Sequence, residues 1–385
     1  MKKTIKIEGS KHFTIQLDYN VHHTTIPLKS SIPITVGVEN RCMTECLNDK
    51  EADKERQRWV DFVLSYRMTP VFGTQITPER WQYEHSFSPW AWNDKRSIRL
   101  LNDRRYSCYM LPFFTLSENE LASLLCNIQK KGKLKESLFY IWDEPAYMED
   151  YEQIKRKVNI IRKYASDARI LTTFFCGPRN GPRKGDLYAV FDYLKHHIHV
   201  ATISLAPCKG NEEEVQHIRY KVPEGIDWWS YVCWQPGGNE PNFLLQMKGI
   251  QQRAIMWRTW KNGSQGFLYW NCNIYHKRNP FTYITDMPHG DGILIYPGDI
   301  LGCKGPIASA RLERWRDGAE EMELLRLVEK NYSKEKADTL LNIVYSSPLS
   351  FIEKAHNIPF FRKELLDQLD KTIPIDYKLR ITDFI

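Results

Sequence analysis

Two adjacent carboxylates, Asp143 and Glu144, follow an apolar and aromatic run in the segment LFYIWDEP, residues 138–145. Two acids this close, beside rings such as that of Trp142, are expected to titrate apart, one ionised and one proton-bearing near neutral pH. Glycoside cleavage needs that division, because one group protonates the leaving oxygen and an anion stabilises the developing positive charge. The alternative is a solvated acidic pair that opens the next helix, where carboxylates are favoured.

The adjacency of the two acids restricts the mechanism. Neighbours on one strand are poorly placed to flank a glycosidic bond from both faces, as two opposed carboxylates would. Their spacing better suits a substrate-assisted reaction, in which the 2-acetamido oxygen of the sugar is the nucleophile. Asp143 would orient the acetamido nitrogen and stabilise charge, and Glu144 would act as general acid and then as general base.

Aromatic residues that could hold a sugar gather in two later apolar segments, which end at Trp234 and at Trp270. An indole at the rim of a site can stack on the apolar face of a sugar, and these two tryptophans are the candidates for that contact. Trp228 and Trp229, inside the first of the two segments, are instead expected to fill the core.

The long segment 271–298 could supply polar contacts to sugar hydroxyls. The candidates are Asn271, Tyr275, Asp291 and Tyr296. Asp291 is the best of them, although a Gly-Asp-Gly sequence is equally typical of a turn that binds nothing. Asp291 also allows an alternative, a glycosidase for another sugar that uses Glu144 together with Asp291. If their carboxyl groups are more than ~6.5 Å apart, an inverting mechanism is plausible. A carbohydrate-binding barrel without catalysis is a further alternative.

No metal or cofactor site is predicted. The histidines at 22–23 and 196–199 lack the H-E-x-x-H spacing of zinc enzymes. The nine cysteines are scattered without a C-x-x-C pair, which is typical of reduced core residues. A G-x-S-x-G sequence is missing, which argues against a serine nucleophile. Four charged residues of the helix predicted at 307–330 are expected to form an outer ion-pair face: Arg311, Arg316, Glu320 and Glu321.

The elements that must position these residues are apolar strands that alternate with amphipathic helices. Eight strands are predicted, with a long loop rich in Trp and Pro before the third: 32–38, 70–73, 108–114, 137–142, 169–176, 198–204, 226–234 and 266–270. Strands that are apolar throughout favour a parallel sheet covered on both faces, and eight such units fit an α/β fold of the (β/α)8 TIM-barrel type. A doubly wound sheet is less favoured, because no G-x-G-x-x-G follows the first strand.

In such a barrel the two acids would lie at the carboxyl end of the fourth strand, the rim where barrel active sites are built. Pro145 would end the strand and keep Glu144 extended. The predicted organisation is a short N-terminal β segment (1–31), a catalytic barrel (32–330) and a C-terminal helical extension (331–385). The extension is expected to hold two or three helices.

Five ordered motifs, spread over about residues 32–330, resemble the catalytic domain of glycoside hydrolase family 123 and its uncharacterised relatives. They are FYIWDEP, WWSYVCWQPGGNEPNF, RAIMWRTWKNGSQGFLYWNCN, GDGILIYPG and SARLERWRDGAEEMELL. The resemblance implies a (β/α)8 barrel and a retaining, substrate-assisted exo-β-N-acetylgalactosaminidase. It implies that Asp143 is the stabiliser and Glu144 the acid/base, and that Tyr231 hydrogen-bonds the acetamido carbonyl. Family members usually carry a larger β-sandwich before the barrel, and here only FTIQLDYNVHHTTIPL resembles its end.

Composition and charge restrict the partners. The chain has 385 residues, 42% of them hydrophobic, and 54 basic against 47 acidic side chains. This mild excess without a dense basic stripe argues against nucleic acid, and no run reaches the ~18 apolar residues of a membrane span. The start lacks the apolar stretch of a signal peptide, so a cytoplasmic location is expected, or a secreted or periplasmic one if a leader has been removed. The expected partner is a glycan or glycoconjugate substrate, and nothing in the sequence indicates an oligomeric state.

Overall fold

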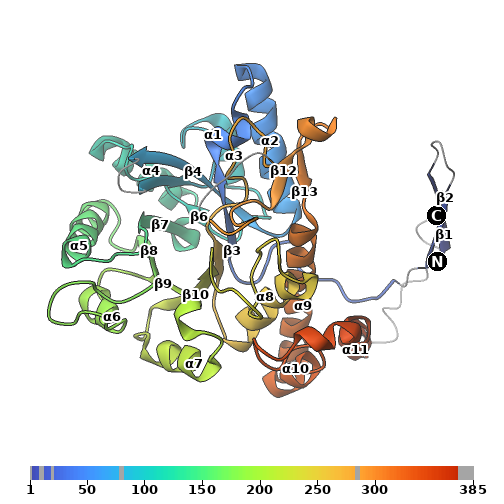
Figure 1. The fold of residues 1–385 in the computed structure, drawn as a ribbon. Coiled ribbons are helices and arrows are strands. Elements are labelled where there is room, and N and C mark those ends of the chain that lie inside the picture. Colours follow the sequence, from blue (N-terminus) through green and yellow to red (C-terminus); the bar gives the residue numbers. More distant parts are fainter. Residues whose placement is uncertain (1, 8–12, 19–20, 78–81, 282–286, 372–385) are drawn as a thin grey trace.

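The structure is a computed structural model that describes residues 2–7, 13–18, 21–77, 82–281 and 287–371 (Figure 1). Eight strands form a barrel wall: β3 (Ile34–Glu39), β4 (Thr69–Thr77), β6 (Tyr109–Met110), β7 (Ser137–Trp142), β8 (Arg169–Phe174), β9 (Val200–Ser204), β10 (Asp227–Val232) and β11 (Phe267–Tyr269). They belong to one sheet with the order β5-β4-β3-β11-β10-β9-β8-β7-β6. All neighbours in it run parallel except β5 (Gln82–Ser86), so the predicted (β/α)8 fold is confirmed.

The sheet closes almost completely. β11 pairs with β3, with Phe267 opposite Ile34, and the remaining seam lies between β4 and β6. β5 is inserted at this seam, and just after it the Phe87 N–H donates to the carbonyl of Met110 at 2.6 Å. The sequence predicted only a loop here, because a short antiparallel strand that follows a gap in the apolar pattern gives little periodic signal.

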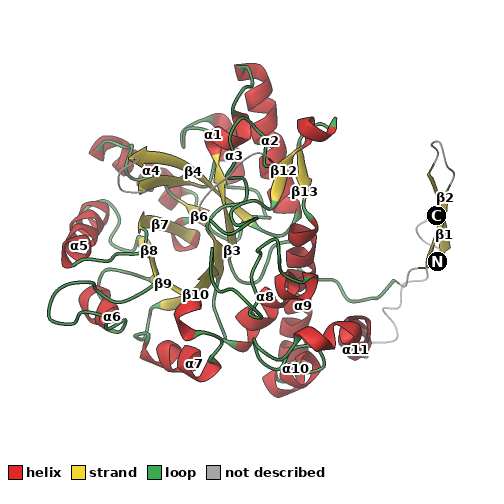
Figure 2. Ribbon diagram, in the orientation of Figure 1, coloured by secondary structure: helices red, strands yellow, loops and turns green. Residues whose placement is uncertain are grey.

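Helices cover the outside of the wall (Figure 2): α1 (Asn40–Thr44), α2 (Asp49–Ser65), α3 (Lys95–Leu100), α4 (Glu118–Lys130), α5 (Met148–Arg162), α6 (Ala189–Leu194), α7 (Glu212–Lys221), α8 (Gly249–Lys261) and α9 (Ala310–Asn331). The helical tail continues with α10 (Lys334–Leu341) and α11 (Ile358–Asp370). Two small antiparallel sheets do not pair with the barrel wall. One consists of β1 (Lys2–Ile7) and β2 (Phe13–Asp18), and the other of β12 (Ile295–Pro297) and β13 (Pro306–Ala308). The division of the chain at residues 31 and 330 stays a prediction.

The core has an inner and an outer part. The inner cluster fills the barrel and consists of Val71, Cys108, Met110, Leu138, Leu171, Val200, Trp229, Tyr231, Cys233 and Leu268. Trp228 points the other way and joins the larger cluster between wall and helices. Both tryptophans are at most 2% exposed, so the prediction that they fill the core is confirmed.

The charged face predicted on α9 is only partly on the outside. Arg316 pairs with Glu313 at the surface, as expected. Glu321, however, is fully buried and accepts hydrogen bonds from Arg253 and from the Trp257 indole. Arg311 is also buried, and it donates to backbone carbonyls of Phe243 and of the segment 290–293. The prediction of an outer face is wrong for these two residues because Glu321 faces α8 and Arg311 faces the loops at 243 and 290–293, so each polar group needs a buried partner.

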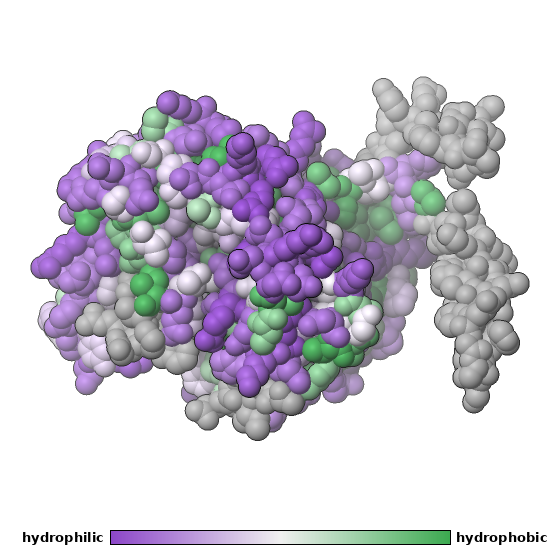
Figure 3. Space-filling model, turned by 90° about the horizontal axis from the view of Figure 1, so that it is seen from above, coloured by the Kyte–Doolittle hydropathy of each residue, from purple (hydrophilic) through white to green (hydrophobic). Residues whose placement is uncertain are grey.

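The surface seen in Figure 3 is mostly hydrophilic, with apolar side chains in small groups. Within the described residues, no helix is long and apolar enough to cross a lipid bilayer.

Candidate active site

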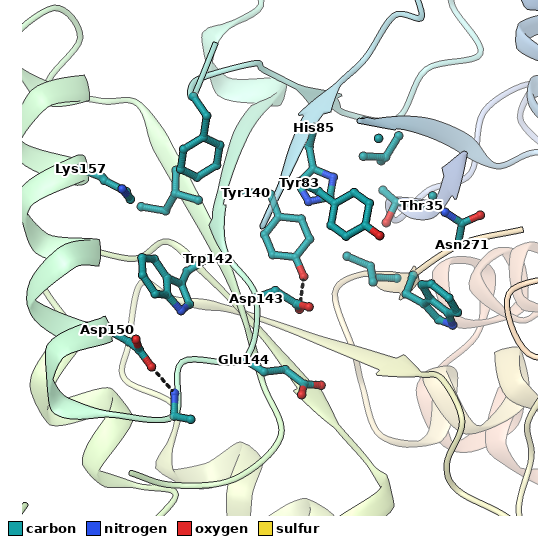
Figure 4. A pocket seen from close by; sticks show the side chains of 18 of the residues that line it. Thr35, Tyr83, His85, Tyr140, Trp142, Asp143, Glu144, Asp150, Lys157 and Asn271 are labelled. Carbon is teal, nitrogen blue, oxygen red and sulfur yellow. Dashed lines mark hydrogen bonds between the residues drawn. The ribbon is translucent and has the colours of Figure 1, made fainter. Parts of the chain in front are cut away.

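A cavity of about 720 Å³ opens at the carboxyl ends of the barrel strands (Figure 4). Its wall contains residues that follow β7, among them Asp143 and Glu144, and residues that follow β11, among them Trp270 and Asn271. This is the end of the barrel at which the sequence predicted the two acids and both sugar-stacking tryptophans, of which Trp270 lines the cavity.

β7 does not keep the regular alternation of side chains up to the acids. Tyr140 packs against the inner cluster, whereas Ile141 and Trp142 both belong with the outer core. The ladder between β7 and β8 shifts its register between Tyr140 and Trp142, as a β-bulge with one extra residue would. The extra residue explains why Asp143 returns to the barrel side and lines the cavity.

Two hydroxyl groups hold one oxygen of Asp143. The Tyr140 phenol donates to Oδ1 at 2.6 Å, and the Thr173 hydroxyl donates to the same oxygen at 2.7 Å. Within the described part of the chain, no donor hydrogen-bonds the second oxygen, Oδ2. Asp143 is therefore fixed in orientation, with one carboxylate oxygen available to a ligand.

Glu144 reaches the same cavity because its backbone turns. Its φ angle is 45°, in the left-handed region that non-glycine residues seldom adopt. The Glu144 N–H donates to the Thr173 hydroxyl oxygen at 2.9 Å, and the Tyr231 phenol donates to the Glu144 carboxylate. The expectation that Pro145 keeps Glu144 extended is wrong, because these two contacts offset the strain of the turn.

The surroundings of Glu144 shift its titration. Burial of its carboxylate in the cavity, together with the negative charge of Asp143, raises the pKa of Glu144 to about 7. The Tyr231 hydrogen bond and the positive charge of Arg179 act in the opposite direction and limit the rise. A carboxyl group with a pKa near neutral can donate a proton in one step and accept one in the next.

Tyr231→Phe is expected to move the alkaline limb of the pH profile of kcat/KM to higher pH. Activity that needs protonated Glu144 is present below its pKa and is lost as the pH rises through about 7. The Tyr231 phenol stabilises the ionised carboxylate, so its removal raises the pKa of Glu144 further. Profiles of kcat/KM against pH for wild type and variant measure the shift. Tyr66→Phe, which removes a phenol bound to Glu313 on the outer helix α9, is the control. An alkaline limb that stays in place or moves to lower pH would contradict the expectation.

Asp291 lies behind Trp270 rather than in the cavity wall. It is 5% exposed, and its Oδ1 accepts hydrogen bonds from the Trp270 indole at 3.0 Å and from the Tyr269 phenol at 2.9 Å. Burial raises the pKa of Asp291 to about 6. Its position indicates that Asp291 orients the Trp270 ring, which lines the cavity, rather than meeting a sugar itself.

Close backbone packing holds the exit of β11 against β3. A Cβ atom at Gly37 would lie 1.8 Å from the Trp270 carbonyl oxygen, so only glycine permits this approach. Asn271 follows at the same edge and lines the cavity, and its Oδ1 accepts from the Asn273 N–H at 2.9 Å. Trp270 and Asn271 are thus brought to the two acids, as predicted.

Three other predicted residues lie outside the cavity wall. Trp234 is 44% exposed at the exit of β10. Tyr275 is fully buried, and Tyr296 stacks on Phe281 with ring centroids 5.7 Å apart. Tyr275 and Tyr296 do not line the cavity. The loop after β11 folds back on itself, because Asn273 pairs with Ile293 and β12 pairs with β13, and this turns both side chains elsewhere.

Sequence reasoning missed the residues that support the acids. These are Tyr140 and Thr173, together with His85, whose ring stacks on that of Tyr140 at 4.4 Å and 10°. Burial lowers the pKa of His85 to about 4, so the imidazole is neutral near pH 7. The one sequence signal for these supporting residues was a polar residue near the carboxyl end of an apolar barrel strand, such as Thr173.

Within the described residues, no three His, Cys, Asp or Glu side chains are grouped as metal ligands would be. His22 pairs with Asp370 on α11 at 2.8 Å, and His199 accepts from the Ile170 N–H at 3.2 Å. These two histidines therefore connect elements of the fold.

Comparison with known proteins gives a matching family model and similar solved structures. The family model described as "Glycoside hydrolase 123, catalytic domain" matches residues 54–328. A family 123 glycoside hydrolase from Clostridium perfringens, studied for the hydrolysis of glycolipid glycans, is 14% identical with a TM-score of 0.63, over 96% of this chain and 76% of that one.

More distant similarities include a β-D-glucuronidase from Dictyoglomus thermophilum, 9% identical with a TM-score of 0.41 over 81% of this chain and 56% of that one. A GH10 xylanase from Thermobacillus composti is 14% identical with a TM-score of 0.33, over 74% and 88% of the two chains. Comparison with curated protein sequences gives no significant match. The family model covers well over half of the chain, and the chain therefore belongs to glycoside hydrolase family 123.

Proposed function

We propose that this glycosidase removes a terminal β-linked N-acetylhexosamine, in the first place N-acetylgalactosamine, by a retaining, substrate-assisted mechanism. The observation that carries the proposal is the pair Asp143 and Glu144 in one cavity, held side by side by the hydroxyl of Thr173. Two carboxylates on consecutive residues cannot attack and protonate from opposite faces of a sugar ring. A nucleophile supplied by the substrate removes that difficulty.

Asp143 is suited to act on the acetamido group. Its Oδ1 is held by Tyr140 and Thr173, and Oδ2 can accept a hydrogen bond from the acetamido N–H of the sugar. That bond would turn the acetamido carbonyl oxygen toward the anomeric carbon. The negative charge of Asp143 would also stabilise the positive oxazolinium ion that forms when this oxygen attacks and the glycosidic bond breaks.

Glu144 is suited to move the proton. In the first step its acid form would protonate the leaving oxygen as the bond to the anomeric carbon breaks. In the second step the resulting carboxylate would take a proton from a water molecule that opens the oxazolinium ion, so configuration is retained and Glu144 is again protonated. Its pKa of about 7 suits both steps. Because the Tyr231 phenol has one proton and donates it to Glu144, this contact competes with the acetamido contact that the family resemblance implied for Tyr231.

The other two hypotheses have less support. A Glu144–Asp291 pair would need Asp291 in the cavity, whereas it is buried behind Trp270 with Oδ1 engaged by two donors. A barrel that only binds carbohydrate would not need the raised pKa of Glu144, which lies near neutral because of burial and the charge of Asp143.

A panel of p-nitrophenyl glycosides tests the proposal. The β-N-acetylgalactosaminide should be hydrolysed with a kcat/KM at least about a hundredfold above that of the β-galactoside, which lacks the internal nucleophile. The β-N-acetylglucosaminide shows how strongly the sugar itself is selected. NMR of the first-formed sugar should show the β anomer. Equal rates on the β-galactoside, or an α anomer as first product, would contradict substrate assistance.

A further inference from the structure

His85 is a polar residue of the cavity wall that the proposed mechanism does not use. Its imidazole stacks on the Tyr140 ring, with centroids 4.4 Å apart, and lies 6.3 Å from the ring of Tyr83 at an angle of 27°. Stacking engages the face of a ring and leaves its edge, which in an imidazole carries both nitrogens. In the described part of the chain, neither nitrogen hydrogen-bonds another residue. Buried polar groups are normally paired, so the edge of His85 is expected to meet a ligand.

Strand β5 holds this imidazole in place from both of its faces. Tyr83 and His85 line the cavity, and Glu84 between them belongs to the opposite face of the strand. The buried Glu84 carboxylate accepts hydrogen bonds from the N–H groups of Phe113 at 2.8 Å and of Thr115 at 2.7 Å. β5 pairs with β4 and contacts β6 and β7, so it fixes His85 at the seam of the barrel.

The order of the groups around β7 follows the order of the carbons in the proposed sugar. Glu144 is held by residues of β8 and β10, whereas His85 comes from β5, on the other side of β7. In Figure 4, Asp143 and Tyr140 accordingly lie between Glu144 and His85. The proposed reaction places C1 of the sugar at Glu144 and the nitrogen on C2 at Asp143. The C3 hydroxyl, which is the next group on the ring, then lies on the side of His85.

We propose that His85 hydrogen-bonds the C3 hydroxyl of the terminal N-acetylhexosamine and selects sugars in which this hydroxyl is free. The inference rests on the proposed function, because C3 reaches His85 only when the acetamido group is bound at Asp143. A neutral imidazole offers one donor and one acceptor, and a hydroxyl can pair with either. A sugar without this hydroxyl leaves the buried nitrogen unpaired, which costs free energy of binding. The substrate class is then a glycan whose terminal residue carries no substituent at C3.

His85→Phe separates this contact from a purely structural role. Phenylalanine keeps a ring that can stack on Tyr140, the donor to Asp143, and removes both nitrogens. The substrates are p-nitrophenyl β-N-acetylgalactosaminide and its 3-deoxy and 4-deoxy analogues. Wild-type kcat/KM should be at least about tenfold lower for the 3-deoxy sugar than for the parent sugar. In His85→Phe, kcat/KM for the parent sugar should fall about tenfold, and the 3-deoxy sugar should then differ from it by less than about twofold. The ratio of parent to 4-deoxy sugar should be the same in both proteins.

The control is His217→Phe, the same change at an exposed position of α7, where the imidazole also lies near a tyrosine ring, that of Tyr188, at 5.7 Å. It should change none of these values.

Two results would overturn the role of His85 while the proposed reaction stands. One is a wild-type protein that hydrolyses the parent and 3-deoxy sugars equally well, which needs no variant. The other is a His85→Phe protein that keeps its activity on the parent sugar, still rejects the 3-deoxy sugar, or loses its selection at C4 instead. A wild-type protein that hydrolyses no β-N-acetylhexosaminide would overturn the proposed function, and this inference with it.

Discussion

Replacement of Glu144 by glutamine is expected to lower kcat for an unactivated β-N-acetylgalactosaminide by roughly 10²–10⁴-fold. Glutamine has the size of glutamate and can still accept the Tyr231 hydrogen bond through its amide oxygen. It cannot give a proton to the leaving oxygen or take one from water, so both steps of the proposed mechanism lose their proton transfer. Steady-state kinetics of the purified variant measure the loss.

The leaving group makes this prediction specific. With a dinitrophenyl leaving group, which departs without protonation, the first step should survive in Glu144→Gln and the second should limit turnover. Added azide should then restore turnover, because it attacks the oxazolinium ion without a general base and gives a β-azide product. Glu152→Gln, the same change at an exposed position of α5, is the control. Full activity of Glu144→Gln on the unactivated substrate would contradict the assignment of Glu144.

The position of the acids in the fold could be predicted because it depends on local sequence. Strand β7 is apolar on both faces, as a strand of a covered parallel sheet must be, and it ends at Trp142, directly before the two acids. The same reasoning identified all eight wall strands and the helix α9. It failed at β5, which is antiparallel and inserted in the seam of the barrel.

The geometry of the acids could not be predicted, because it depends on partners far away in the chain. Thr173 and Tyr231 stand 29 and 87 residues from Glu144, and no local pattern indicates that they converge on it. The bulge in β7 and the positive φ of Glu144 both break the regular alternation on which sequence arguments depend. These two irregularities bring neighbouring side chains into one cavity, although a regular strand would place them on opposite faces.

The loop after β11 shows the same limit. Polarity alone selected Asn271, Tyr275, Asp291 and Tyr296, but backbone pairing within the loop decides where each side chain points. Asn271 lines the cavity because it lies next to the strand end, whereas Tyr275 is turned into the core. Asp291 does not line the cavity and instead accepts a hydrogen bond from the Trp270 indole.

Replacement of Asp143 by asparagine is expected to lower kcat on β-N-acetylgalactosaminides by roughly 10²–10³-fold, the cost of losing one oriented group that stabilises transition-state charge. The asparagine oxygen can still accept from Tyr140 and Thr173, so the side chain should keep its place. Its amide nitrogen then replaces Oδ2 and presents a donor to the acetamido N–H, where the mechanism needs an acceptor. Steady-state kinetics on the same substrate as for Glu144→Gln give the comparison.

A second readout separates this role from simple misfolding. The negative charge of Asp143 contributes to the raised pKa of Glu144, so Asp143→Asn should move the alkaline limb of kcat/KM to lower pH, opposite to the shift expected for Tyr231→Phe. Tyr140→Phe removes one donor to Oδ1 but keeps the charge, so its kcat should fall by only about tenfold. An Asp143→Asn variant that kept its kcat, or whose alkaline limb moved upward, would show that Asp143 does not supply the charge beside Glu144. Opposite shifts from the two neighbours of one carboxyl group would instead identify Glu144 as the group whose proton limits the reaction.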